Sequence, residues 1–448
     1  MNVLVVDMTH GGLLIASELS KIYEKEILAW DIYGTVDEST KRDYNKKGLK
    51  FINKISTLSD DDLMVIAPVH CNFESKVDMS HHDAVKYILK DRINVPIIEV
   101  TGVKGKTSVV GMLKEIFKEV KPLVLSSLGV EVFDGRSWKL LKRNISITPA
   151  SIIEAWGLVK DYEVGICIFE TSLGGTGLAD IGILTNLAED YPIANGSSSA
   201  SMAKGQIFKS KLVACDLDSF NSKYSEFKEK TNIFYNKIVN DKVEANLTVD
   251  NIEFGFDKTE IRLKMVDFKT IHNNTFNGSL ELSTFAPASI HINNVMAAVS
   301  AALMFEMPIK NIQAGMANFK GLKGRTSINC FEGIRIIEEI NPGLNVAAVK
   351  ESLYMMDDMD DVAIVFGGKY GVTCEEIDEN SVSKVLDSIE DNNSLILVDE
   401  LGSGVKNSLN RDFNYYDNID DGINFAIKND CSNILVIYRS NYSDLKNR

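Results

Sequence analysis

The chain has 448 residues, which is enough for about three domains of roughly 150 residues each. Hydrophobic residues make up 45% of it and charged residues 25%, with only 8 prolines, so the composition excludes a fibrous or wholly disordered protein. A net charge of −15 argues against a protein that binds nucleic acid or an anionic membrane through a broad basic face. We therefore expect a globular protein, and the charge does not exclude a local basic pocket for a phosphorylated ligand.

The sequence favours a cytoplasmic location. No stretch approaches the ~20 consecutive apolar residues of a membrane span, and the start of the chain runs into VLVVD without the basic region of a secretory signal. The six cysteines form no CxxC pair and the six histidines no HExxH motif, so disulfides and structural zinc are poorly supported.

Residues 1–92 are predicted to form an N-terminal Rossmann-like substrate domain. Three apolar runs have the length of buried strands: Val3–Asp7, Ile27–Ile32 and Leu63–Ala67. A turn at residues 9–12 precedes helical spacing of apolar residues, but it lacks the GxGxxG pattern that would indicate dinucleotide binding.

Residues 93–325 are predicted to form a central nucleotide-binding domain. Its expected strands are the apolar runs 95–100, 164–169 and 181–184, and helical spacing of apolar residues follows the first of them over 109–120. Between residues 244 and 285 apolar residues alternate with polar ones, which predicts a β-rich insertion before a helix at 290–305.

Residues 326–448 are predicted to form a C-terminal Rossmann-like α/β domain. Strand-like runs at 362–366, 395–398 and 434–438 alternate with helical stretches at 382–389 and 422–427. The expected fold class is therefore α/β, with three domains.

One glycine-lysine motif between a predicted strand and helix carries the chemistry. It reads GxxGKT, two residues shorter than the usual phosphate loop, and its backbone N–H groups and the following helix N-terminus suit an anion. Lys106 would neutralise phosphate oxygens and Thr107 would ligate Mg²⁺. A turn that only closes a βα unit is the structural alternative. The predicted nucleotide contacts are Gly102, Val103, Lys104, Gly105, Lys106, Thr107 and Ser108.

The loop and five later segments resemble the Mur ligase superfamily, whose members activate a carboxylate with ATP. Residues 101–107 are similar to the family's TGTxGKT loop, with Val103 in place of a threonine. The later segments follow in the family's order: Phe169–Ser172, Thr185–Asp190, Ala203–Phe208, His291–Ala298 and Phe319–Arg325. The resemblance implies a three-domain architecture in which a central P-loop ATPase domain lies between two Rossmann-like domains, and it implies ATP and Mg²⁺ as cofactors.

The resemblance also implies roles for single residues. Glu170 would hold Mg²⁺, and Lys204 matches a lysine that is often carbamoylated and would then support a second Mg²⁺. Lys106, Glu170 and Lys204 are thus the predicted catalytic residues. A surface carboxylate at a strand end and a solvated helix lysine are the structural alternatives for Glu170 and Lys204.

Asn294 would contact adenine and Arg325 a phosphate, although an amide inside an alanine-rich helix has a structural explanation too. In the last domain, residues 338–343 stand where the peptide-forming members of the superfamily have a longer D-x-Y-x-x-NP motif. Glu338 or Glu339 would take the role of the acidic residue that contacts the nucleotide.

Three segments resemble archaeal members of the superfamily that complete the nickel tetrapyrrole coenzyme F(430): 7–12, 30–35 and 338–345. This resemblance implies an ATP-dependent ligase that closes a carbon ring on a tetrapyrrole carboxylic acid. Thr9, His10, Glu339 and Asn341 are the predicted substrate contacts. A turn that needs two glycines explains the segment around His10 equally well.

Two other functions fit parts of the sequence. An amide-forming ligase for an archaeal cell-wall (pseudomurein) or cofactor precursor would share the activation step and differ in its nucleophile. A P-loop kinase or a non-catalytic nucleotide-binding regulator would need only the loop, and leaves the segments beyond it without a role. The sequence shows no NKxD motif for guanine.

Overall fold

The computed structural model describes residues 2–53, 63–71, 73, 76–188, 190–238, 243–255, 257–323, 325–356, 362–371, 377–390, 393–429 and 431–440. Glu189 and Gly324, which belong to segments quoted above, and part of the predicted β-rich insertion (Phe256) lie outside these residues. The chain divides into two compact units. The first comprises Met1–Asn251, Arg262–Glu281 and Asn293–Met316, and the second Ile252–Ile261, Leu282–Ile292 and Ala317–Arg448. The domain limits after residues 92 and 325 stay predictions.

The N-terminal sheet is parallel, with strand order β3-β2-β1-β4-β5. Its strands are β1 (Asn2–Val6), β2 (Ile27–Trp30), β3 (Leu49–Phe51), β4 (Leu63–Ala67) and β5 (Met79–Ser80), and its helices are α1 (Leu13–Leu19), α2 (Glu38–Asn45) and α3 (His81–Leu89). The predicted first strand was one residue too long, because Asp7 leaves the sheet with a φ of +67°. A capping box of Ser80 and Asp83 fixes the start of α3.

The central sheet has eleven strands in the order β18-β17-β16-β15-β14-β11-β6-β10-β7-β8-β9. Its middle is parallel and fully buried, which explains the continuous apolar runs in the sequence. The strands are β6 (Ile97–Thr101), β7 (Pro122–Ser126), β8 (Gly129–Phe133), β9 (Trp138–Lys142), β10 (Ile166–Glu170), β11 (Ile181–Leu184), β14 (Leu212–Asp216), β15 (Thr231–Ile238), β16 (Leu247–Glu253), β17 (Thr259–Lys269) and β18 (Thr275–Thr284). The last three confirm the predicted β-rich insertion.

Helices α4 (Lys106–Ile116) and α5 (Pro149–Gly157) follow strands of this sheet, and the helical segments α6 (Ala200–Lys204) and α7 (Leu217–Ser219) are short. The two-stranded ribbon β12 (Pro192–Ile193) and β13 (Ser198–Ser199) precedes α6. Helices α8 (Ser289–Met304) and α9 (Ile309–Asn318) come after the insertion. The predicted helix at 290–305 corresponds to α8, whose alanine-rich interior is buried.

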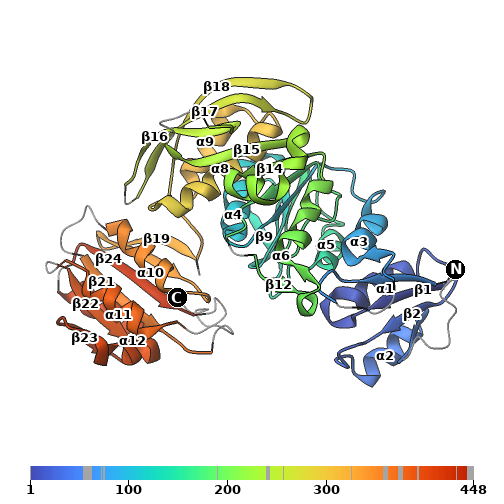
Figure 1. Cartoon of the computed structure of the whole chain (residues 1–448), viewed down its shortest axis with the longest axis horizontal. Coiled ribbons are helices and arrows are strands. Elements are labelled where there is room, and N and C mark those ends of the chain that lie inside the picture. Colours follow the sequence, from blue (N-terminus) through green and yellow to red (C-terminus); the bar gives the residue numbers. More distant parts are fainter. Residues whose placement is uncertain are drawn as a thin grey trace. The chain divides into compact units, whose positions relative to one another are not determined.

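The C-terminal sheet has the order β19-β20-β24-β21-β22-β23, coloured orange to red in Figure 1. Only β19 is antiparallel to its neighbour. The elements are β19 (Thr326–Phe331), β20 (Ile334–Ile340), α10 (Val346–Leu353), β21 (Val362–Gly368), α11 (Glu379–Asp387), β22 (Ser394–Val398), α12 (Asp399–Val405), β23 (Asn414–Tyr416), α13 (Ile419–Lys428) and β24 (Asn433–Arg439). In the described part of the chain, no helix is both long and apolar enough to cross a membrane.

Candidate functional site

The phosphate-loop motif lies between β6 and α4, as predicted. Gly102 and Gly105 have φ values of +142° and +84°, which side chains other than glycine rarely adopt. A Cβ atom on Gly105 would lie 2.0 Å from Oδ1 of Asn294, and one on Gly102 would lie 2.0 Å from Oγ1 of Thr185. The loop is therefore a tight backbone cradle against which Asn294 packs, and it fits a bound phosphate chain.

The segment after β11 holds this cradle in shape. The Thr185 hydroxyl donates to the Lys104 carbonyl (2.6 Å), and the Asn186 side chain both donates to that carbonyl (3.1 Å) and accepts from the Lys104 amide (3.2 Å). The Val103 amide donates to the Asn186 carbonyl (3.0 Å), and Asn293 of α8 donates to the carbonyl of Thr185 (2.7 Å). Two segments that sequence analysis matched to the family thus act as the scaffold of the loop.

Oxygen atoms suited to a hard cation gather at the first turn of α4. The Thr107 hydroxyl donates to Oε1 of Glu170 (3.0 Å) and lies 3.1 Å from the hydroxyl of Ser127, whose amide donates to Oε2 of the same carboxylate (3.0 Å). Glu170 ends β10 and is 1% exposed. Hydroxyl and carboxylate oxygens are ligands that Mg²⁺ prefers, so these residues fit the predicted metal role. Lys106 Nζ donates to the carbonyls of Gly102 and Val103, at 3.1 and 3.2 Å.

Lys204 is a buried lysine beside this loop. Only 1% of it is exposed, and its Nζ donates to the carbonyl of Ser172, two residues beyond β10 (2.8 Å). Burial and, to a smaller extent, the positive charge of Lys106 lower the pKa of Lys204 from 10.5 to about 7. Burial thus favours the neutral amine of Lys204, which is the form that reacts with carbon dioxide. The structural alternative of a solvated helix lysine is wrong.

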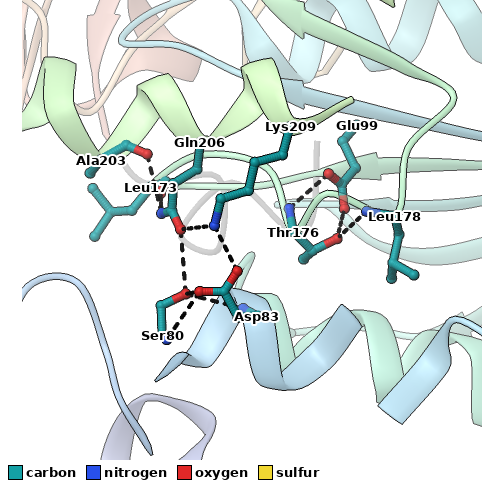
Figure 2. Close-up of polar contacts among 9 residues, drawn as sticks. All are labelled: Ser80, Asp83, Glu99, Leu173, Thr176, Leu178, Ala203, Gln206 and Lys209. Atoms are coloured by element: carbon teal, nitrogen blue, oxygen red, sulfur yellow. Dashed lines mark hydrogen bonds and ion pairs between the residues drawn. The ribbon is translucent and has the colours of Figure 1, made fainter. Parts of the chain in front are cut away.

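Two polar clusters hold the segment from Leu173 to Leu178, which directly follows Ser172 in the chain (Figure 2). Glu99 of β6 accepts from the amide of Thr176 (2.8 Å) and from its hydroxyl, and burial raises the pKa of Glu99 to about 7. Gln206 donates to the carbonyl of Leu173 (3.2 Å), while Lys209 pairs with Asp83 of α3 (2.6 Å). The helix α3 of the N-terminal sheet is thereby tied to the residues that follow Lys204.

A cavity of about 250 Å³ lies between these segments and the N-terminal sheet. His81 is buried and donates through Nε2 to the carbonyl of Val6 (2.9 Å). His82 is 2% exposed, and neither of its ring nitrogens has a hydrogen-bond partner among the described residues. The cavity is lined by His10, Pro68, Val69, His70, His81, His82, Thr148, Pro149, Ser172 and Leu173. Of the predicted substrate contacts, His10 lines this cavity, while Thr9 hydrogen-bonds Thr35 (2.6 Å).

The remaining predicted residues belong to the second unit. Glu339 is buried and accepts a hydrogen bond from the hydroxyl of Thr326. Burial raises the pKa of Glu339, while the Thr326 hydrogen bond and the charge of Arg325 act to lower it. His291 also hydrogen-bonds Thr326 (3.0 Å). The Asn341 side chain accepts from the Gly343 amide (3.0 Å). The nucleotide and substrate roles of Arg325, Glu339 and Asn341 stay predictions.

Sequence analysis did not identify several residues of this region as site residues, among them Asp7, His70, His82, Ser127 and Ser172. His70 and Ser172 each come two or three residues after a buried parallel strand. In open α/β sheets ligands bind at the carboxyl ends of the strands, so this position was an available signal.

Comparison with known proteins shows which sequences this chain is similar to. The sequence model described as "Coenzyme F430 synthetase CfbE, C-terminal domain" matches residues 328–441. The chain is 29% identical to the coenzyme F(430) synthetase of Methanosarcina acetivorans over 419 residues, covering 86% of each chain. It is also 29% identical to the enzyme of that name from Methanocaldococcus jannaschii, over 91% of this chain and 93% of the relative.

The fold agrees with these likenesses. The structure of the MurF ligase of Thermotoga maritima in complex with ADP superposes with a TM-score of 0.56 at 12% identity, covering 94% of this chain and 92% of that one. The chain is thus similar in sequence to coenzyme F(430) synthetases and in fold to Mur ligases. This Mur ligase-like chain has the expected α/β architecture of three domains, and its relatives support the coarse assignment of an ATP-dependent ligase.

Proposed function

We propose that the chain closes a carbocyclic ring on a nickel tetrapyrrole, using ATP to activate a propionate side chain of a seco-acid precursor. The observation that carries the proposal is the likeness to two coenzyme F(430) synthetases along 86% and 91% of the chain. The family match to residues 328–441 supports it because this is the region where the sequence departs from peptide-forming ligases. The substrate is thus a small molecule, and its nickel is part of that substrate.

In the first half-reaction a carboxylate oxygen of the propionate attacks the γ-phosphorus of ATP. The new O–P bond forms as the bond from the γ-phosphorus to the bridging oxygen breaks, and ADP leaves. Backbone amides of residues 102–107 hold the phosphates, and the Lys106 ammonium reduces the repulsion between two anionic reactants. Mg²⁺ on the oxygens of Thr107 and Glu170 would supply positive charge for the phosphoryl group.

In this scheme Lys204 carries either a neutral amine or a negatively charged carbamate. The neutral amine would add to carbon dioxide and release one proton to give a carbamate, an anion that would support a second Mg²⁺. Its contact with the Ser172 carbonyl sets its place between the phosphate loop and the cavity lined by His10 and His82. We propose that the reacting side chain of the substrate enters this cavity. Asn294, packed on Gly105, would contact the adenine, and Arg325 a phosphate.

In the second half-reaction a carbon atom of the macrocycle attacks the acyl carbon. A C–C bond forms, the bond from the acyl carbon to the phosphate oxygen breaks, phosphate leaves, and the carbon nucleophile loses a proton. Phosphate leaves far more readily than hydroxide, which is why activation is needed. The chain's contribution is to align the two ends of the substrate and to keep water away from the acyl phosphate.

The predicted domains take the corresponding roles in this proposal. Residues 1–92 would bind the substrate and 93–325 ATP, while Glu339 and Asn341 of 326–448 stay predicted substrate contacts. This division of labour is the one that the superfamily resemblance implies.

The test is to incubate the full chain with ATP, Mg²⁺ and the nickel seco-acid, without any amine. We expect one ADP and one phosphate per product, and a product lighter than the acid by one water. Lys106→Ala is the matched control, since it removes the phosphate-loop cation. ADP release that requires an added amine, with the amine retained in the product, would instead identify an amide-forming ligase. No ATP turnover with the nickel seco-acid, either without or with an added amine, would refute this acid as the substrate.

A further inference from the structure

Three side chains of the N-terminal sheet converge on one point. Asp7 follows β1, His10 lies three residues later, and His70 follows β4, the strand that pairs with β1. Oδ2 of Asp7 lies 2.7 Å from Nδ1 of His10 and 3.2 Å from Nε2 of His70, and the two nitrogens lie 3.4 Å apart. One carboxylate oxygen and two imidazole nitrogens therefore form a compact triangle.

The size of this triangle matches metal coordination. Ligands bound 2.0–2.1 Å from one ion at right or tetrahedral angles lie about 2.9–3.4 Å apart. The three separations, 2.7, 3.2 and 3.4 Å, need shifts of only a few tenths of an ångström to meet that range. Two imidazoles and one carboxylate suit divalent ions such as Ni²⁺, Co²⁺ and Zn²⁺, whereas Mg²⁺ prefers oxygen ligands alone.

The surroundings point to a ligand as well. The side chain of Asp7 is fully buried, while those of His10 and His70 are 45% and 25% exposed and line the cavity described above. His82, which lines the same cavity, is buried with both ring nitrogens unpartnered among the described residues. An ion held by three side chains keeps further positions open for a ligand, and such a ligand would have polar groups to meet in this cavity.

We propose that Asp7, His10 and His70 bind one free divalent transition-metal ion, whose open positions accept an oxygen of a ligand in the cavity. The ion is distinct from nickel inside a tetrapyrrole. A macrocycle fills four in-plane positions and leaves only two, on opposite faces, which three protein atoms within 3.4 Å of one another cannot share. The proposal is independent of ring closure and of the Mg²⁺ site at Thr107 and Glu170.

The test is Ni²⁺ titration of the tag-free full chain by calorimetry, after chelator treatment, without nucleotide and with excess Mg²⁺ present. Binding of Co²⁺, followed by its visible absorption, reports the nitrogen ligands directly. Asp7→Asn and His70→Gln are the site variants; asparagine tolerates the left-handed backbone of Asp7, so the turn is kept. His272→Gln is the control, because it removes an exposed imidazole elsewhere.

We expect one equivalent of Ni²⁺ on the wild-type chain and on His272→Gln, undisturbed by Mg²⁺, and at least tenfold weaker binding by both site variants. Thermal unfolding of the variants shows whether they are folded. If the wild-type chain binds Ni²⁺ no more tightly than the two site variants do, or does not bind it at all, the metal site is overturned. A hydrogen-bonded Asp–His–His cluster then remains. Either result would leave the ligase proposal untouched.

Discussion

Replacing Lys204 by methionine should stabilise the fold while it destroys activity. The buried amine has a pKa of about 7 in the folded chain against 10.5 for an ordinary lysine. Between these two values the unfolded chain carries a proton that the folded chain lacks, so stability falls as the pH falls from 10.5 towards 7 and changes no further below that. Methionine has a similar length and no charge to desolvate.

The size of the effect follows from the two pKa values. Burial of the Lys204 amine lowers the free energy of unfolding by about 4 kcal/mol at pH 7.5 and by about 1.4 kcal/mol at pH 9.5. The variant also leaves the carbonyl of Ser172 without its donor, which costs about 1–3 kcal/mol at any pH. Lys204→Met should therefore be more stable than the wild type by about 1–3 kcal/mol at pH 7.5, and this advantage should shrink by about 2.5 kcal/mol at pH 9.5.

Urea unfolding at the two pH values, in buffers free of carbon dioxide, measures this difference. The change with pH is the decisive quantity, because the lost Ser172 contact cancels from it. Lys310→Met, an exposed lysine on α9, controls for removal of a surface charge. A stability difference between wild type and Lys204→Met that stays constant from pH 7.5 to 9.5 would refute the reasoning, since it would mean that Lys204 stays protonated inside the fold.

Three further variants test the phosphate loop. Lys106→Ala should lower carboxylate-dependent ADP release at least about a hundredfold at an unchanged melting temperature; normal turnover would contradict the loop assignment. Glu170→Gln should raise the Mg²⁺ concentration for half-maximal rate at least about tenfold, and a wild-type Mg²⁺ dependence would remove the metal role. Gly105→Ala should cost about 1–2 kcal/mol in urea unfolding through its positive φ, and should raise the KM for ATP by displacing Asn294, whereas an unchanged stability and KM would speak against the tight cradle.

Much of the central architecture could be predicted because its strands are buried on both faces. The predicted runs Leu63–Ala67 and Ile181–Leu184 coincide with β4 and β11 from end to end. The hairpin of β19 and β20 was not predicted, because its outer strand is half exposed and carries the polar sequence TSINCF. Exposed edge strands lose the continuous apolar signal that a parallel interior provides.

The site was only partly predictable for a related reason. The loop is read from local spacing and Glu170 from a segment that resembles the family, but the neighbours of His10 come from elsewhere in the chain. His70 is 60 residues away, and no periodicity links the two. The burial of Lys204 could not be predicted either, because a lysine in the short segment ASMAK gives no sign that the carbonyl of Ser172 will accept a hydrogen bond from it.

One geometric rule nevertheless joins both parts of the first unit. Asp7 comes one residue after β1, His70 three after β4, Gly102 one after β6 and Ser172 two after β10. Parallel strands end at one edge of their sheet, so each residue is delivered by the end of a strand and needs little further chain to reach its place. His10 and Ser172, from two different sheets, then line one cavity. Insertions in the connecting helices should consequently leave these contacts intact, whereas a single residue inserted between a strand end and its functional side chain would move that side chain out of reach.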